Sequence, residues 1–197
     1  MKISVKAFWL CVIAITIGCQ SEPPAASNTD APKPQTVEAT PVNVSDSRSR
    51  ALAAKDALFD KLSTRLVQAM SNGGPAAAIE VCSKDAARLA ADVSEEHGVQ
   101  IGRTSFKLRN PQNTPPDWAG QMVEERVSEP TFIDLPDGHL GALLPIKLMP
   151  QCMACHGPKE QIAEDVQTAL AALYPDDQAT GFNVDELRGW FWVDVPQ

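Results

Sequence analysis

The chain has 197 residues, which is enough for one folded domain of ordinary size. Hydrophobic residues make up 44% and charged residues 21%, so the composition is that of a globular protein and excludes a fibrous or wholly disordered one. The net charge of −8 counts against nucleic acid, or an anionic membrane surface, as the main partner.

The first 18 residues have the pattern of a signal peptide. Lys2 and Lys6 precede an uncharged run over residues 7–18, of about 12 residues. A membrane-spanning helix needs about 20 apolar residues, and Glu22 follows too soon. We therefore expect export from the cytoplasm and removal of residues 1–18.

The end of this run resembles the lipobox of bacterial lipoproteins. Gly18 precedes Cys19, although Thr16 stands where a lipobox usually has Leu. We expect acylation of Cys19 and a lipid anchor on the periplasmic side of the cell envelope. Gln20 favours the outer membrane by resemblance to Gram-negative sorting. The alternative is ordinary cleavage and secretion of a soluble protein.

Residues 19–48 are expected to form a disordered tether, and residues 49–197 the folded domain. The tether carries five prolines with many small polar residues and no aromatic residue, so it cannot bury a core.

The folded domain is predicted to begin with two helices. Apolar residues recur at helical spacing over 46–70, and Asn72-Gly-Gly-Pro then interrupts the pattern. Pro75 suits the first turn of a second helix, which Gly98 would end. The apolar face of this second helix includes Cys82.

The rest of the domain alternates short strands and helices. Strands are expected at 99–104 and 190–195, and a hairpin at 131–135 and 139–148 around Pro-Asp-Gly. Helices are expected at 118–129 and 160–173, and a loop at 109–116. This order predicts an α+β fold with an antiparallel sheet.

Residues 152–156 read Cys-Met-Ala-Cys-His, the attachment motif of c-type haem. Cys152 and Cys155 would add across the two vinyl groups of the porphyrin, and His156 would reach the iron from the proximal side. Export supports this interpretation, because covalent haem attachment is extracytoplasmic. Three alternatives stay open: a thioredoxin-like motif, which lacks its βαβ context here, a structural zinc site, which needs more ligands, and a plain disulfide.

The remaining cysteines leave one candidate for the other axial position. Cys11 lies in the signal peptide and Cys19 is expected to be acylated, so Cys82 is the leftover thiol. A lone Cys on an apolar helix face is usually a small buried hydrophobe, but a free thiol is oxidisable after export. The alternatives are His97, His139, a Met residue or a vacant site.

The domain resembles a family of bacterial and cyanobacterial c-type haem domains with a PAS-like fold, long classed as a domain of unknown function. The segments that carry the resemblance are spread over most of residues 50–197 and comprise 78–82, 102–113, 145–146, 152–157, 174–182 and 187–193. The resemblance implies one covalent haem c ligated by the motif His and by a Cys from an upstream helix, here His156 and Cys82. It also implies a sensor or redox role.

Three cations between residues 103 and 109 are candidates for contact with the haem propionates, namely Arg103, Lys107 and Arg109. The alternative is a solvated strand edge and a fixed loop.

The expected function is that of a monohaem cytochrome-like protein acting in electron transfer, or as a redox or ligand sensor, through a redox or signalling partner protein. The alternative is a peroxidase-like haem enzyme, which would need an open distal site.

Overall fold

The computed structural model describes residues 44–197. The expected signal peptide, the acylation site Cys19 and the tether up to residue 43 lie outside these residues. The first helix begins at Val44, so residues 44–48, expected to belong to the tether, are helical.

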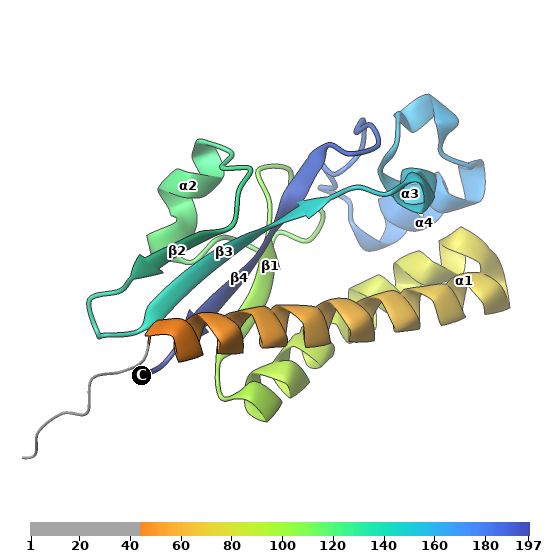
Figure 1. The fold of residues 1–197 in the computed structure, drawn as a ribbon. Coiled ribbons are helices and arrows are strands. Elements are labelled where there is room, and N and C mark those ends of the chain that lie inside the picture. The colour runs from red at the N-terminus through yellow and green to blue at the C-terminus, as the bar shows by residue number, and fades with distance from the viewer. Residues whose placement is uncertain (1–43) are drawn as a thin grey trace, which may run out of the picture. The chain divides into compact units, whose positions relative to one another are not determined.

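The long helix α1 (Val44–His97) is two helices joined at a sharp break (Figure 1). Gly73 has extended φ, and Gly74 has φ of 74°, a left-handed conformation that glycine adopts without steric cost. Pro75 follows at once and begins the second half. The two predicted helices and their break at 72–75 are confirmed. The halves lie side by side, and Lys61 pairs with Glu96 across them.

One antiparallel sheet of four strands follows the order β1-β4-β3-β2. The strands are β1 (Gln100–Thr104), β2 (Thr131–Asp134), β3 (Leu140–Lys147) and β4 (Leu187–Val195). The predicted hairpin is β2–β3, closed by Gly138 with φ of 78°. The α+β fold with an antiparallel sheet is therefore confirmed.

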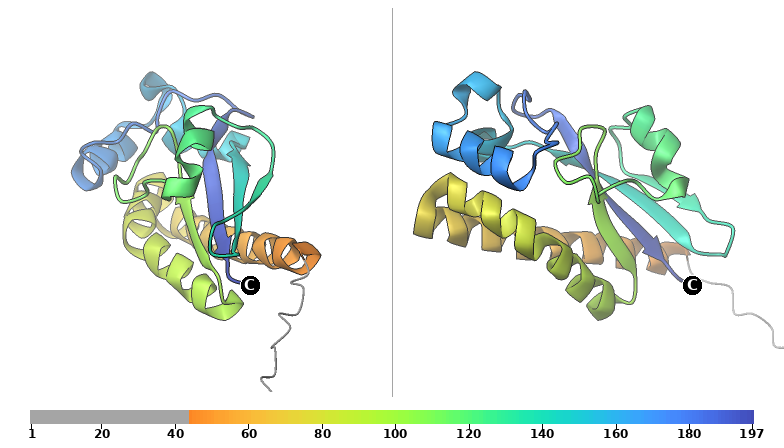
Figure 2. Two further views of the ribbon diagram at one scale, coloured as in Figure 1. Left: turned by 90° about the vertical axis from the view of Figure 1, so that its left-hand side faces the viewer. Right: turned by 180° about the vertical axis from the view of Figure 1, so that it is seen from behind.

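The two faces of the sheet pack against different helices (Figures 1 and 2). Phe191, Val193 and Val195 of β4 lie in one core with residues of both halves of α1. Trp190 points to the other face, where it packs in a cluster with Ala119 and Val123 and donates its indole N–H to Val127 O at 2.8 Å. This alternation is what places α1 and α2 (Gly120–Glu124) on opposite sides.

Two predicted helices are shorter than expected. Over 118–129 the chain forms only the 3-10 turn η1 (Asp117–Ala119) and α2, and Arg126 with φ of 54° follows. Over 160–173 the 3-10 turn η3 (Lys159–Gln161) is separated by an extended residue from α4 (Glu164–Leu173). Within residues 44–197, no helix is both long and apolar enough to cross a membrane.

Candidate functional site

The Cys-x-x-Cys-His segment lies directly beyond the end of β3. It forms the 3-10 turn η2 (Pro150–Cys152) and the short helix α3 (Met153–His156), beside α4 (Figure 1). Backbone hydrogen bonds fasten it to the chain just before β4: the Phe182 N–H donates to His156 O at 3.0 Å, and the Gly181 N–H to Gly157 O at 2.8 Å. The segment is therefore held by the loop at 174–186.

The two cysteines of the motif face different apolar clusters. Cys152 packs with Leu148, Ala179 and Phe182. Cys155 packs with a cluster that includes Ile79 of α1 and Tyr174 after α4. Both side chains are half-buried, and neither forms a disulfide. Burial raises the pKa of Cys155. The motif thus presents two free thiols.

His156 is held in one tautomer. Its Nδ1 lies 2.7 Å from the carbonyl oxygen of Ala179, which can only accept, so Nδ1 carries the proton and Nε2 keeps a free lone pair. Burial, followed by repulsion from Arg109 and Arg188, holds the pKa of His156 well below its usual value. A neutral imidazole whose Nδ1–H is bonded to a carbonyl is the usual form of a metal-ligating histidine.

Cys82 belongs to the same neighbourhood. It lies one turn after Ile79, which packs in the Cys155 cluster, on the second half of α1 that passes below α4. Burial raises the pKa of Cys82, and the nearby charges of Arg103 and Arg109 oppose that rise. A charge on Cys82 in turn raises the pKa of Cys155. The structure therefore brings the leftover thiol to the Cys-x-x-Cys-His segment.

The alternative histidines lie elsewhere. His139 precedes β3, whereas the motif follows the end of this strand, about 26 Å further at 3.3 Å per residue. His139 Nδ1 pairs with Asp194 at 2.7 Å. His97 ends α1, roughly 22 Å along the helix from Cys82 at 1.5 Å per residue. Both histidines are thus separated along their elements from the motif or from Cys82, whereas Cys82 lies near Cys155 of the motif.

The three cations singled out in the sequence have different surroundings. Arg109 pairs with Asp177 at 3.1 Å and donates to Cys155 O at 2.6 Å. Lys107 donates to Thr180 O at 3.3 Å and lies over the Phe182 ring. The side chain of Arg103 is half-buried and makes no hydrogen bond or ion pair with any residue of 44–197, and burial lowers its pKa. Arg103 is thus the cation with a guanidinium left to bind something else.

A fourth cation, Arg188, was not identified from the sequence. It donates to Ser105 Oγ at 2.7 Å and to Lys107 O at 3.0 Å, and its Nε is buried without a hydrogen-bond partner. Burial, together with repulsion from Arg109 and Arg103, lowers its pKa to about 10. Arg188 precedes the strand predicted at 190–195, so the sequence pattern gave no orientation for it. In the structure β4 begins at Leu187, so Arg188 belongs to the strand, and its side chain lies among those of the site.

We call Arg103, Lys107, Arg109 and Arg188 the cation cluster. Within the described residues, a single ion pair, Arg109–Asp177, links this cluster to a carboxylate. Positive charge therefore exceeds negative charge here, although the whole chain carries −8. Such an excess in partly buried surroundings favours an anionic ligand.

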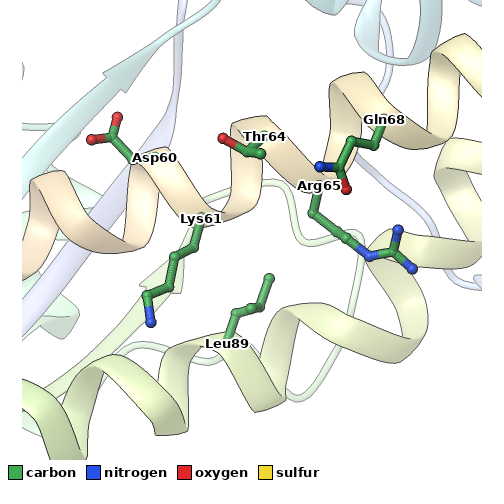
Figure 3. Close-up of a pocket in the computed structure, with 6 residues that line it drawn as sticks. All are labelled: Asp60, Lys61, Thr64, Arg65, Gln68 and Leu89. Carbon is green, nitrogen blue, oxygen red and sulfur yellow. The ribbon is translucent and has the colours of Figure 1, made fainter.

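A separate hollow lies between the two halves of α1 (Figure 3). Its volume is about 350 Å³, and its lining includes Lys61, Arg65 and Leu89. Lys61 and Arg65 are already paired with Glu96 and Asp85. The hollow contains no residue of the Cys-x-x-Cys-His segment, and we do not assign it to the site.

The fold and site define an α+β protein with a Cys-x-x-Cys-His segment at one end of an antiparallel sheet. Residues 30–196 match the model of the Tll0287-like family (Tll0287), and the chain belongs to this family. The crystal structure of the cyanobacterial heme-protein Tll0287 has the same fold, with a TM-score of 0.55 and 23% sequence identity; the match covers 79% of this chain and 98% of that one. A search of curated proteins found no match.

Proposed function

We propose that this chain binds one haem c through thioether bonds to Cys152 and Cys155, with His156 as the proximal iron ligand. The observation that carries the proposal is the free Nε2 lone pair of His156, fixed by the Nδ1–H bond to Ala179 O, beside two free thiols at the required spacing. Haem iron would supply a reversible one-electron Fe(III)/Fe(II) couple.

The cation cluster supports a dianionic cofactor. A haem carries two propionates, and the cluster has more positive charge than its one ion pair neutralises. Arg103 is the strongest candidate for a propionate contact, because its guanidinium has no other partner among the described residues. Lys107 and Arg109 are weaker candidates, because protein oxygens already engage their donors.

We further propose Cys82 as the second axial ligand. Among the alternatives, His97 and His139 lie at distant positions in the fold, and Met149 is 41% exposed. A thiolate opposite an imidazole favours Fe(III) and lowers the reduction potential. Burial raises the pKa of the Cys82 thiol, and the positive charges of Arg103 and Arg109 oppose part of this rise. Binding to Fe(III) would itself favour the thiolate.

The role that this ligand pair supports is electron transfer, or redox or ligand sensing, through a partner protein. An electron carrier keeps Cys82 on the iron in both oxidation states, whereas a sensor exchanges it on reduction. The ferrous protein would bind carbon monoxide promptly in the second case and not in the first. A peroxidase-like enzyme would instead show an open, five-coordinate ferric iron and peroxide turnover.

The cofactor assignment is tested by expressing the full chain together with a c-type cytochrome maturation system. We expect a Soret band and a pyridine haemochrome spectrum typical of two thioether bonds, with haem that resists extraction by acidified acetone. The Cys152→Ala, Cys155→Ala double variant should lose covalent haem. Cys82→Ala, the matched control, should keep it. A colourless wild-type protein with both motif thiols titratable would contradict the proposal.

The expected export and lipid anchor are likewise a proposal. It rests on the sequence pattern over residues 1–19 and on the extracytoplasmic chemistry of haem attachment. Cys19→Ser should abolish labelling by radioactive palmitate and release the protein from the membrane fraction of a Gram-negative host. Wild-type protein that is unlabelled and already soluble would contradict the anchor.

A further inference from the structure

Arg109 donates hydrogen bonds to oxygen atoms of the motif and of the loop that holds it. Its Nη2 donates to Cys155 O at 2.6 Å and to Ala179 O at 3.3 Å, and its Nε donates to both carboxylate oxygens of Asp177 at 3.2 Å. The side chains of Arg109 and Asp177 are only 11% and 9% exposed. The pair is therefore buried, and the Nε and Nη2 donors of Arg109 point at the protein.

Asp177 also binds the backbone of Ala179. Its Oδ1 accepts the backbone N–H of Ala179 at 2.8 Å, while Arg109 reaches the carbonyl of the same residue. Ala179 is itself fully buried. The ion pair thus fixes both the N–H and the C=O of Ala179, which sets the direction of its carbonyl group.

The Ala179 carbonyl is also the acceptor for His156 Nδ1–H. Two donors therefore share one oxygen: the neutral imidazole at 2.7 Å and the charged guanidinium at 3.3 Å. A charged donor draws electron density from the oxygen and weakens it as an acceptor for the second donor. The strength of the Nδ1–H bond governs how electron-rich the imidazole is toward a metal at Nε2.

We propose that Arg109, paired with Asp177, is a positioning residue that orients the Ala179 carbonyl and limits its hydrogen bond to His156, instead of binding a haem propionate. This inference rests on the proposed haem at His156. It assigns a different role to a residue that the sequence alone offered as a propionate contact. Arg103 then remains the main propionate candidate of the three.

Two effects of Arg109 must be separated, its charge and its hydrogen bonds. Arg109→Lys keeps the charge but loses the planar fork that reaches Cys155 O, Ala179 O and Asp177 together. Lys107→Gln is the matched control for charge. Lys107 belongs to the same cation cluster and contacts Thr180 O, but it makes no hydrogen bond to Ala179 or to the motif.

The experiment measures the midpoint potential and the ferric electron paramagnetic resonance g-values of the holoproteins. With its competing donor lost, Ala179 O binds His156 Nδ1–H more strongly, the imidazole donates more to Fe(III), and the midpoint potential of Arg109→Lys falls below that of wild type. The g-values shift with it. The fall should exceed any change in Lys107→Gln. A potential of Arg109→Lys that is unchanged or raised overturns the inference.

Arg109→Gln provides a second test if Arg109→Lys does not fold. Its potential should fall further than that of Lys107→Gln, because it loses the same charge and also the hydrogen bonds. Equal falls in the two variants would mean that charge alone acts, and would overturn the inference. A merely structural role would lower stability and leave the potential in place. Failure of the proposed function is distinguishable, since wild type would then carry no covalent haem at all.

Discussion

The helical hairpin, which is the two halves of α1, and the Cys-x-x-Cys-His end of the molecule differ in how far their basic side chains are paired with acidic ones. In the hairpin, several basic side chains have acidic partners within α1, in the pairs Lys61–Glu96, Arg65–Asp85 and Arg88–Asp92. In the cation cluster, only Arg109 of the four basic side chains forms an ion pair, with Asp177. Charge in these hairpin pairs is balanced, whereas the excess of positive charge in the cation cluster favours a further anion.

The largest loss of stability should come from removing Asp177, the one carboxylate that pairs with the cation cluster. Asp177→Ala leaves Arg109 buried without its partner, which costs about 3–5 kcal/mol in the free energy of unfolding. Asp92→Ala, on the exposed hairpin pair, should cost about 0.3–0.5 kcal/mol. Urea denaturation of both variants measures the difference. Similar losses in the two would mean that the regions do not differ.

A smaller effect is expected from Arg103. Positive charge near a haem iron favours the less positive ferrous state, so Arg103→Gln should lower the midpoint potential. The expected fall in midpoint potential is tens of millivolts, where ~59 mV is a tenfold change in the equilibrium constant of a one-electron couple. Arg88→Gln removes the same charge from the hairpin surface and should leave the potential unchanged, because solvent and salt screen it. Equal shifts in a redox titration would contradict this prediction.

The smallest effect concerns the rim of the site. Glu186 accepts hydrogen bonds from the side chain and backbone of Asn183, which lower the pKa of its carboxyl. A lowered folded-state pKa stabilises the fold above the usual value of 4.5, and this contribution disappears as pH falls through the lowered pKa. Glu186→Gln should therefore be less stable than wild type at pH 7, and the gap should narrow below pH 4.5. A gap that is constant with pH would contradict this assignment.

The fold could be predicted from the sequence where local signals were strong. The glycines and proline at 73–75 marked the break in α1, and Pro-Asp-Gly marked the β2–β3 hairpin. Both limits of α2 and the start of α4 were wrong, because apolar spacing extends over residues whose backbone is not α-helical, whereas the end of α4 at Leu173 was predicted correctly. Arg126 at positive φ ends the first of these segments, and no composition signal announces a positive φ in arginine.

The residues of the candidate site also differ in how far the sequence could predict them. The motif cysteines and His156 are contiguous, so their spacing alone identified them. Cys82 was predicted by accounting for the other thiols and by resemblance, and in the structure it lies near Cys155 of the motif. The network around Ala179 O could not be predicted, because it joins Arg109, His156 and Asp177 from three separate segments. Only the folded chain shows which donors share an acceptor.

We propose above all that His156 and Cys82 bind one haem iron from opposite sides. Electron paramagnetic resonance of the ferric wild-type protein beside Cys82→Ala, both with covalent haem, tests it most directly. We expect a low-spin signal typical of thiolate ligation in wild type and its loss in the variant. Identical spectra from the two proteins, or a high-spin five-coordinate signal from wild type, would contradict it.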